Sequence, residues 1–234
     1  MITVYPHKDL GHANHGWLDA RHHFSFAHYY NPKRLGFGVL RVINDDTIAA
    51  GSGFDTHPHK DMEIITYVRQ GAITHRDSQG NEGRTKAGDV QVMSAGRGVF
   101  HSEFNLEDED TKIFQIWIEP NKIGVTPSWD AHAFPKETSE TKLDLLVSGD
   151  GNAPLFIHQD AFIYAGHLKQ GAKVMHPIKH QAYVVVSSGE VEINGHALNT
   201  GDGAEIIDLD AVEIHALAES KILVIDVPAK QTTH

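Results

Sequence analysis

Short runs rich in β-branched and aromatic residues recur along the whole chain, and Gly, Asn or Asp bounds most of them. This pattern is typical of strands that are joined by tight turns. No segment of comparable length carries the apolar period of an amphipathic helix, so the sequence predicts an all-β protein. The expected strands cover residues 38–43, 63–69, 88–93, 112–118, 143–147, 182–187 and 221–227.

Two turn sequences predict hairpins between neighbouring strands. The run Asp77-Ser-Gln-Gly80-Asn81 lies between two strand-like segments, and Asn194-Gly195 is a dipeptide that favours a tight hairpin. Many short strands whose edges are closed favour a barrel or a jelly roll.

Two stretches of the chain resemble each other. Residues 67–71 (YVRQG) are similar to residues 185–189 (VVSSG), and the Gly-Asp pair at 88–89 is repeated at 201–202. Three prolines and a polar run lie between the two copies, in residues 120–142, which is the composition of a linker. The chain is therefore predicted to be an internal duplication that forms two β-domains.

Five residues that can bind a metal ion lie in two tight groups, with His57, His59 and Glu63 in the first and His101 and Glu103 in the second. Side chains two residues apart on a strand share a face, so each group contains a pair that points the same way. Two adjacent strands could therefore aim four ligands at one point. A buried polar network without a metal is the competing interpretation, although such a network costs free energy in desolvation unless a cation compensates.

The second copy provides a test of these residues. Counted from the shared glycines, their positions in the second copy hold Met175, Pro177, Gln181, Ile214 and Ala216. A shift of one residue recovers only His176 and His215. Because the second copy is expected to fold without the set, folding does not require these polar groups in the first copy. Their presence in the first copy therefore calls for another cause.

Composition and charge narrow the function classes. The formal net charge is -11, and the 20 Lys and Arg residues form no basic run, so direct nucleic-acid binding is not expected. The chain has no cysteine, so any metal must be held by nitrogen and oxygen ligands. No apolar segment has the length of a signal peptide or a membrane span, and we expect a cytoplasmic protein without a membrane partner.

The spacing of Gly51, His57, His59 and Glu63, followed by Gly88-Asp89 and His101, resembles the two sequence motifs of the cupin superfamily. Further segments are similar to one branch of it, the pirin family: GWLDARH from residue 16, FSF from 24, GFGVLRVI from 36, THPH from 56, DMEI from 61, HRDS from 75, MSAG from 93 and HSEFN from 101. The resemblance implies a bicupin of two antiparallel β-barrel (jelly-roll) domains. Residues 1–130 would form a metal-binding cupin domain and residues 131–234 a degenerate one.

The resemblance also implies a ligand set. The pirin ligands map onto His57, His59, His101 and Glu103. Glu63 is then expected beside them, pointing inward by strand parity and accepting a hydrogen bond from a ligand imidazole. Candidates for pocket walls, with ordinary core packing as the alternative, are Phe54, Tyr67, Met93 and Phe114.

Several pirins are quercetin 2,3-dioxygenases, so the resemblance implies a metal-dependent enzyme that cleaves a flavonol with dioxygen and releases carbon monoxide. Glu103 would act as the catalytic base that takes the proton of the flavonol 3-hydroxyl. Three histidines and one carboxylate suit Fe(II) first, and Mn, Co, Ni, Cu and Zn remain open.

Two alternatives stay open at this point. One is a metal-binding, redox-sensing regulator that acts through protein partners, because the eukaryotic pirin binds transcription factors. The other is a different metal-dependent cupin enzyme, such as an isomerase or hydrolase that uses Zn.

Overall fold

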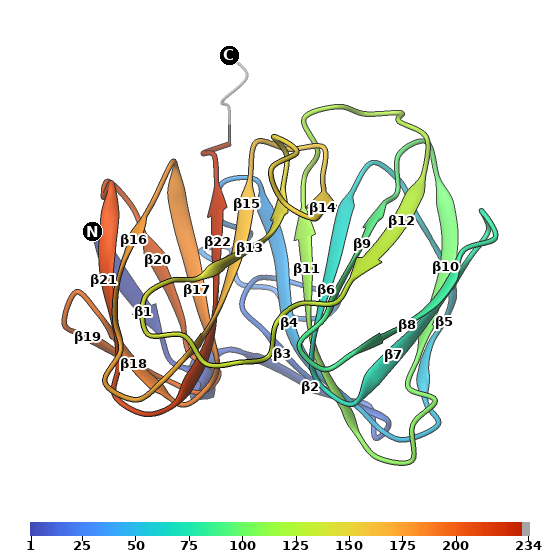
Figure 1. The fold of residues 1–234 in the computed structure, drawn as a ribbon. Coiled ribbons are helices and arrows are strands. Elements are labelled where there is room, and N and C mark those ends of the chain that lie inside the picture. The colour runs from blue at the N-terminus through green and yellow to red at the C-terminus, as the bar shows by residue number, and fades with distance from the viewer. Residues whose placement is uncertain (231–234) are drawn as a thin grey trace.

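The computed structural model describes residues 1–230, and these form 22 strands and one short 3-10 helix, η1 (His7–Asp9). No α-helix occurs within these residues, so the all-β prediction is confirmed. The strands make two barrels that lie side by side, the first on the right and the second on the left in Figure 1. Every segment that was expected to be a strand overlaps an observed one.

The first barrel consists of a seven-stranded and a four-stranded sheet. The large sheet has the order β12-β9-β6-β11-β4-β3-β2, and the small sheet has the order β5-β10-β7-β8. Their bounds are β2 (Gly11–Asn14), β3 (Leu18–His22), β4 (Leu40–Ile48), β5 (Gly53–His59), β6 (Glu63–Gln70), β7 (Ala72–Asp77), β8 (Glu82–Lys86), β9 (Val90–Ser94), β10 (Val99–Phe104), β11 (Thr111–Ile118) and β12 (Ser128–His132).

The second barrel repeats this plan. Its large sheet has the order β1-β20-β17-β22-β15-β13-β14, and its small sheet has the order β16-β21-β18-β19. The bounds are β1 (Ile2–Tyr5), β13 (Asp144–Ser148), β14 (Leu155–Phe156), β15 (Phe162–Leu168), β16 (Lys173–Pro177), β17 (Gln181–Ser188), β18 (Glu190–Ile193), β19 (His196–Asn199), β20 (Gly203–Ile206), β21 (Ala211–Ala216) and β22 (Ser220–Val227).

The repeated glycines occupy equivalent turns in the two barrels. Gly71 follows β6 and Gly189 follows β17, and both have a positive φ, at 73° and 88°. The amide of Gly88 donates to the carbonyl of Val68 at 2.7 Å, and the amide of Gly201 donates to that of Val186 at 2.8 Å. Both acceptors lie three residues before the turn glycine, so the two copies have the same local register.

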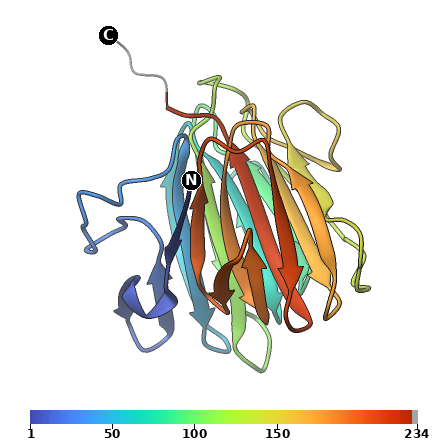
Figure 2. The same cartoon turned by 90° about the vertical axis from the view of Figure 1, so that its left-hand side faces the viewer.

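Edge strands lie at the start of the predicted first domain and at its predicted boundary with the second domain. The strand β1 pairs with β20 and therefore lies in the sheet of the second barrel, where Figure 2 draws it in dark blue. The strand β12 pairs with β9 in the first barrel and contains the predicted boundary between residues 130 and 131. Local sequence does not specify which distant sheet edge a short strand will join.

The outer faces of the two large sheets pack against each other in one shared core. Phe114 and Ile65 from the first barrel meet Tyr183 and Ile225 from the second, and all four are buried. The central strands are therefore buried on both faces. This explains why they appear in the sequence as almost continuous apolar runs.

The interiors of the barrels differ in polarity. A row of neighbouring residues across the first large sheet is polar, and it consists of Gln91, Thr66, Gln115, Asn44 and His22. The strand pairing aligns the first four of these with Ala204, Val184, Val224 and Tyr164 in the second barrel. The second interior is thus filled largely with apolar side chains, whereas the first has kept hydrogen-bonding groups.

The shared core predicts that the two barrels unfold together. All three tryptophans of the chain, Trp17, Trp117 and Trp129, lie in the first barrel, whereas Ile225 lies in the second. We expect Ile225→Ala to lower the free energy of unfolding by about 2–5 kcal/mol and to shift urea transitions followed by tryptophan fluorescence and by circular dichroism equally. A circular dichroism transition that precedes the fluorescence transition would contradict this coupling.

Candidate metal centre

Three of the histidines that the sequence singled out come together on the small sheet of the first barrel. His57 and His59 lie on β5, and His101 lies opposite His57 on the adjacent strand β10. One ring nitrogen from each lies within 4.8 Å of the others. The predicted convergence of these three imidazoles is therefore present in the structure.

Glu103 belongs to a second, overlapping group. A β-bulge between His101 and Glu103 places Glu103 opposite Phe54 of β5 rather than in step with the histidine pair. On its other side Glu103 lies opposite His75 of β7. The carboxylate falls within 4.8 Å of the rings of His75 and His101, but the group that joins His57, His59 and His101 does not include it.

Donors from the opposite sheet hold the Glu103 carboxylate. Its Oε1 accepts hydrogen bonds from Gln91 Nε2 at 2.7 Å and from Thr66 Oγ1 at 3.2 Å, and its Oε2 accepts one from Gln115 Nε2 at 3.3 Å. The side chain is almost fully buried. The polar row inside the barrel therefore orients a buried carboxylate beside the imidazoles.

The facing nitrogens of His57 and His101 fit a cation between them. His57 Nδ1 lies 2.6 Å from the carbonyl oxygen of Asp55, which can only accept, so Nδ1 carries the hydrogen and Nε2 carries a lone pair. This Nε2 faces Nε2 of His101 at 3.0 Å. Two nitrogens that bind one ion at about 2.1 Å and at right angles lie about 3.0 Å apart. The spacing thus suits an ion with five or six ligands.

Burial keeps two of these imidazoles neutral. Desolvation, followed by the neighbouring histidines, lowers the pKa of His59 to about 4 and that of His101 to about 3. Neutral imidazole is the form that binds a metal. At neutral pH neither ring has to lose a proton before it binds.

Glu63 does not accept a hydrogen bond from any of the clustered imidazoles, which is the contact that was expected of it. Its Oε2 accepts a hydrogen bond from Ser94 Oγ at 2.6 Å, its Oε1 has no partner, and burial raises its pKa. It belongs to neither group of metal-ligating residues within the described chain. The prediction that it bonds a ligand imidazole is wrong, because the turn at residues 60–62, with Asp61 at φ 46°, separates β5 and β6 into different sheets.

The four pocket-wall candidates separate into one wall and three core residues. Phe54 lines a cavity with Trp17 and His57. Tyr67 and Phe114 pack in the shared core between the barrels, and Met93 packs in a smaller apolar cluster. Of the four candidates, only Phe54 therefore lies in the wall of a cavity beside the clustered histidines.

A second cavity, of about 480 Å³, opens at the end of the first barrel. Its walls include the apolar side chains of Phe26 and Phe54 and the polar side chains of Asn44, Asp46 and Gln115. Such a volume lies in the range of about 300–1,000 Å³ that is usual for small-molecule sites. Gln115 lines this cavity and also donates to Glu103, whereas none of the four expected ligands lines it.

Asp46 gives this cavity an unpaired polar group. Its Oδ1 is buried without a hydrogen-bond partner. Burial, and then the charges of Asp45 and Glu103, raise the pKa of Asp46 well above its usual range. Burial therefore favours the protonated form of Asp46, which can donate a hydrogen bond, more than in an exposed aspartate.

The equivalent place in the second barrel has lost the ligands. Strand pairing aligns His57 with His176, His101 with Val212 and Glu103 with Ile214. Ile214 and Ala216, the counterparts that were expected for His101 and Glu103, each lie two residues C-terminal to the observed ones. Only the buried His176 remains of the set, so this barrel is degenerate as a metal site.

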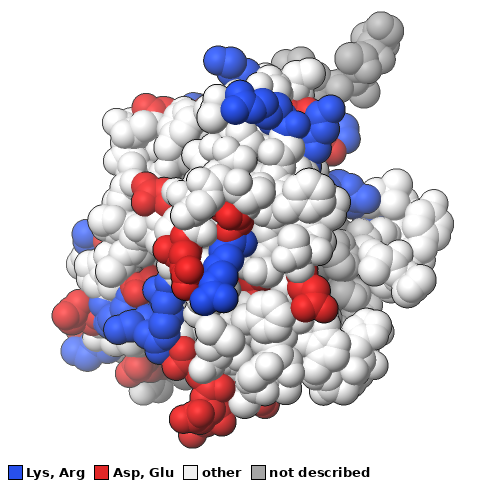
Figure 3. All heavy atoms as spheres, turned by 90° about the vertical axis from the view of Figure 1, so that its right-hand side faces the viewer, with Lys and Arg blue, Asp and Glu red and all other residues white. Residues whose placement is uncertain are grey.

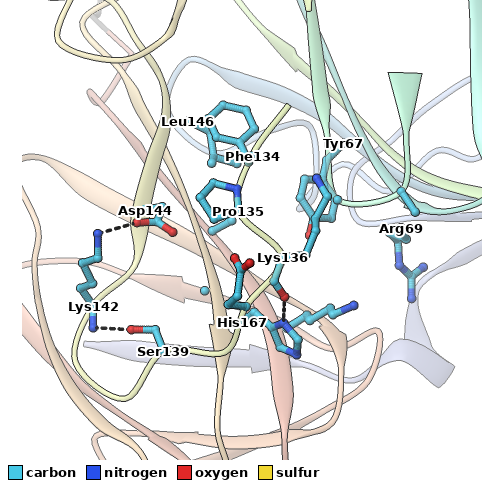
Figure 4. Close-up of a pocket in the computed structure, with 16 residues that line it drawn as sticks. Tyr67, Arg69, Phe134, Pro135, Lys136, Ser139, Lys142, Asp144, Leu146 and His167 are labelled. Carbon is cyan, nitrogen blue, oxygen red and sulfur yellow. Dashed lines mark hydrogen bonds and ion pairs between the residues drawn. The ribbon is translucent and has the colours of Figure 1, made fainter. Parts of the chain in front are cut away.

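A separate cavity of about 190 Å³ lies between the barrels (Figure 4). The linker residues Pro135 and Ser139 form one side of it, and Tyr67 forms another. Lys142 pairs with Asp144 at 2.9 Å there. None of the three clustered histidines lines this cavity, so it is distinct from the candidate centre.

The outer face of the first barrel carries charges of both signs (Figure 3). Arg76 pairs with Glu82 and Arg84 pairs with Glu107 on and near β7 and β8. Within residues 1–230, no helix has the length and hydropathy needed to cross a bilayer.

Comparisons with known proteins agree with this architecture. A paired barrel fold with imidazoles converging in the first barrel defines a bicupin. Residues 4–118 match the family model for pirin, and residues 145–227 match that for the quercetinase C-terminal cupin domain. The chain belongs to the pirin family.

Three relatives illustrate the similarity. The chain is 52% identical to a putative quercetin 2,3-dioxygenase of Pseudomonas aeruginosa, over 97% of this chain and 100% of the relative. It is 44% identical to quercetin 2,3-dioxygenase of Escherichia coli, over 97% and 99%. The crystal structure of the bacterial pirin YhhW from Escherichia coli in complex with nickel(II) matches with a TM-score of 0.92 and 44% identity, over 98% of this chain and 100% of that one.

Sequence reasoning missed two residues beside the site. His75 and Asp77 lie on β7, and both side chains are only 1% exposed. They are two residues apart on one strand, which is the same spacing as the two pairs that were recognised. That spacing is the sequence signal that indicates them, although Asp77 also begins the turn sequence of a hairpin.

We expect His101→Ala to abolish tight metal binding, because it removes the ligand that joins both groups. The affinity for Ni(II), measured by competition with a chelator, should fall by more than about 100-fold. His176→Ala removes a buried histidine at the equivalent position of the second barrel and is the matched control. Equal affinities in the two variants would contradict the assignment.

The pH dependence of stability offers a second test. Burial lowers the pKa of His176 to about 4 from 6.5. Between these values only the unfolded chain holds the proton, so the free energy of unfolding falls as pH decreases, by up to about 1.4 kcal/mol per pH unit for this residue. The metal-free His176→Leu variant should therefore lose less stability than the parent between pH 6.5 and 4. Parallel denaturation profiles would rule out a neutral His176.

Proposed function

We propose that this protein is a metal-dependent dioxygenase that cleaves a flavonol such as quercetin, with the metal held by His57, His59, His101 and Glu103. The observation that carries the proposal is the pair of Nε2 atoms that face each other at 3.0 Å beside a buried carboxylate. The names of the 52% and 44% identical relatives support the reaction class.

The residues present fit a divalent ion. Three imidazoles would supply nitrogen ligands, and Glu103 would supply an oxygen ligand from the side of His101. This set leaves coordination positions for other ligands on an ion that takes five or six. A closed structural site would use all of them.

When bound, the ion would supply a Lewis acid that increases the acidity of the flavonol 3-hydroxyl and an open position for dioxygen. We favour Fe(II), because a nitrogen and oxygen ligand set suits redox-active first-row metals, and the nickel(II) complex of the similar pirin makes Ni(II) the next candidate. One flavonol and one dioxygen give one ring-opened ester and one carbon monoxide.

Glu103 is the residue that would accept the proton of the 3-hydroxyl. Its Oε1 already accepts two hydrogen bonds, whereas its Oε2 accepts a single long one from Gln115. Oε2 is therefore the atom with capacity for a proton. Gln91 and Thr66 fix the carboxylate so that this oxygen keeps its place during the transfer.

The end cavity suits a flat aromatic substrate. Its apolar walls, including Phe26 and Phe54, can pack against aromatic rings, and the carboxyl group of Asp46 and the amides of Asn44 and Gln115 can bond to hydroxyl groups. Polar groups placed between apolar walls can orient a small molecule.

Glu103→Gln tests the proton transfer. The amide keeps the shape and the contacts with the barrel but cannot act as a base, so kcat should fall by about 10²- to 10⁴-fold while metal content is largely retained. Oxygen-dependent release of carbon monoxide from quercetin measures the reaction. Glu107→Gln changes a carboxylate on the same side of the barrel that pairs with Arg84, and its rate should equal that of the parent. An unchanged rate in Glu103→Gln would remove this residue from the mechanism.

A further inference from the structure

A chain of three side chains leads away from the candidate centre into the small sheet. His101 Nδ1 lies 3.4 Å from His75 Nδ1, and His75 Nε2 lies 2.9 Å from Asp77 Oδ2. Strand pairing builds this chain, because β7 places Asp77 opposite His101 and His75 opposite Glu103. The chain continues the line of contacts that begins at His57.

When the His75 ring carries a single hydrogen, the hydrogens along this chain have one consistent arrangement. The carboxylate of Asp77 only accepts, so His75 Nε2 carries a hydrogen and Nδ1 of the neutral ring accepts. His101 must then donate from Nδ1, and its Nε2 holds a lone pair. That lone pair is the one that faces His57, whose own Nε2 is fixed in the same state by the carbonyl of Asp55.

Neighbouring residues bury the side chains of His75 and Asp77 and restrain them. The ring of Trp129 stacks on His75 with an interplanar angle of 10° and centroids 5.1 Å apart. Gly83, opposite His75 on β8, permits this cover, because a Cβ there would lie 2.2 Å from the Trp129 ring. The hairpin holds Asp77 through the amides of Gln79 and Asn81, which donate to Oδ1 at 2.9 and 3.1 Å. In such a site each hydrogen bond is stronger than in water.

From these contacts we infer that Asp77 and His75 are positioning residues that fix the tautomer of His101, so that its Nε2 lone pair points into the imidazole cluster. They thereby hold this nitrogen ready for the cation and increase its basicity through the terminal carboxylate. This inference rests on the proposed function in one respect, because it uses the same cation site. The hydrogen positions themselves do not depend on the reaction.

Asp77→Asn should exchange donor and acceptor in each hydrogen bond between residue 77, His75 and His101, with almost no change in side-chain shape. The amide oxygen can keep the bonds from the backbone amides of Gln79 and Asn81, which leaves the amide nitrogen to donate to His75 Nε2. His75 then donates from Nδ1, and His101 accepts at Nδ1 and carries its hydrogen on Nε2. In this state the Nε2 of His101 cannot bind a cation.

The experiment measures histidine tautomers and metal affinity on the full chain. Two-bond ¹⁵N–¹H correlation spectra of the metal-free parent should give a hydrogen on Nε2 of His75 and on Nδ1 of His101. Asp77→Asn should give the opposite tautomers and bind Zn(II) about 10–100-fold more weakly. Glu82→Gln, which removes an exposed carboxylate from the same hairpin, should match the parent in both measurements.

Three results would overturn the inference. These are a parent His75 with its hydrogen on Nδ1, an Asp77→Asn variant with parental tautomers and affinity, and a second Zn(II) held by His75, His101 and Glu103. A parent protein that has the expected tautomers and binds Zn(II), but releases no carbon monoxide from a flavonol, would contradict the proposed function and support the role of Asp77 and His75.

Discussion

The position of β10 between β5 and β7 is the constraint on which the site depends. Its backbone pairing sets His101 between His57 on one side and Asp77 on the other. Neither neighbour is adjacent to His101 in the sequence, yet together they determine what its two ring nitrogens contact. A slip of one residue in this register would turn the imidazole out of the barrel.

The duplicated fold separates what the barrel needs for stability from what the site needs for chemistry. Both copies bury the same strands in one shared core, and that core is apolar on both sides. Their interiors differ, because the second barrel fills with aliphatic side chains where the first places Thr66, Gln91 and Gln115 around Glu103. The second barrel shows that the fold does not require polar groups at these positions, and in the first barrel they hold the Glu103 carboxylate.

Strand identity and the three-histidine cluster could be predicted from the sequence, since burial on both faces produces long apolar runs and the period of two fixes which side chains share a face. Three features depended on tertiary geometry instead. The bulge beside Glu103 moved its carboxylate toward His75, the turn at Asp61 took Glu63 into another sheet, and the edge strand β1 joined the distant barrel. Parity is a property of one strand, and it does not carry across a bulge or a turn.

The central claim is that His57, His59 and His101 bind one ion. X-ray absorption spectroscopy of the Ni(II)-loaded or Fe(II)-loaded protein tests it most directly, because imidazole rings give characteristic multiple scattering. Three imidazole nitrogens at about 2.1 Å, together with oxygen ligands, are the expected result. A spectrum with oxygen ligands alone, or with a single imidazole, would contradict the account.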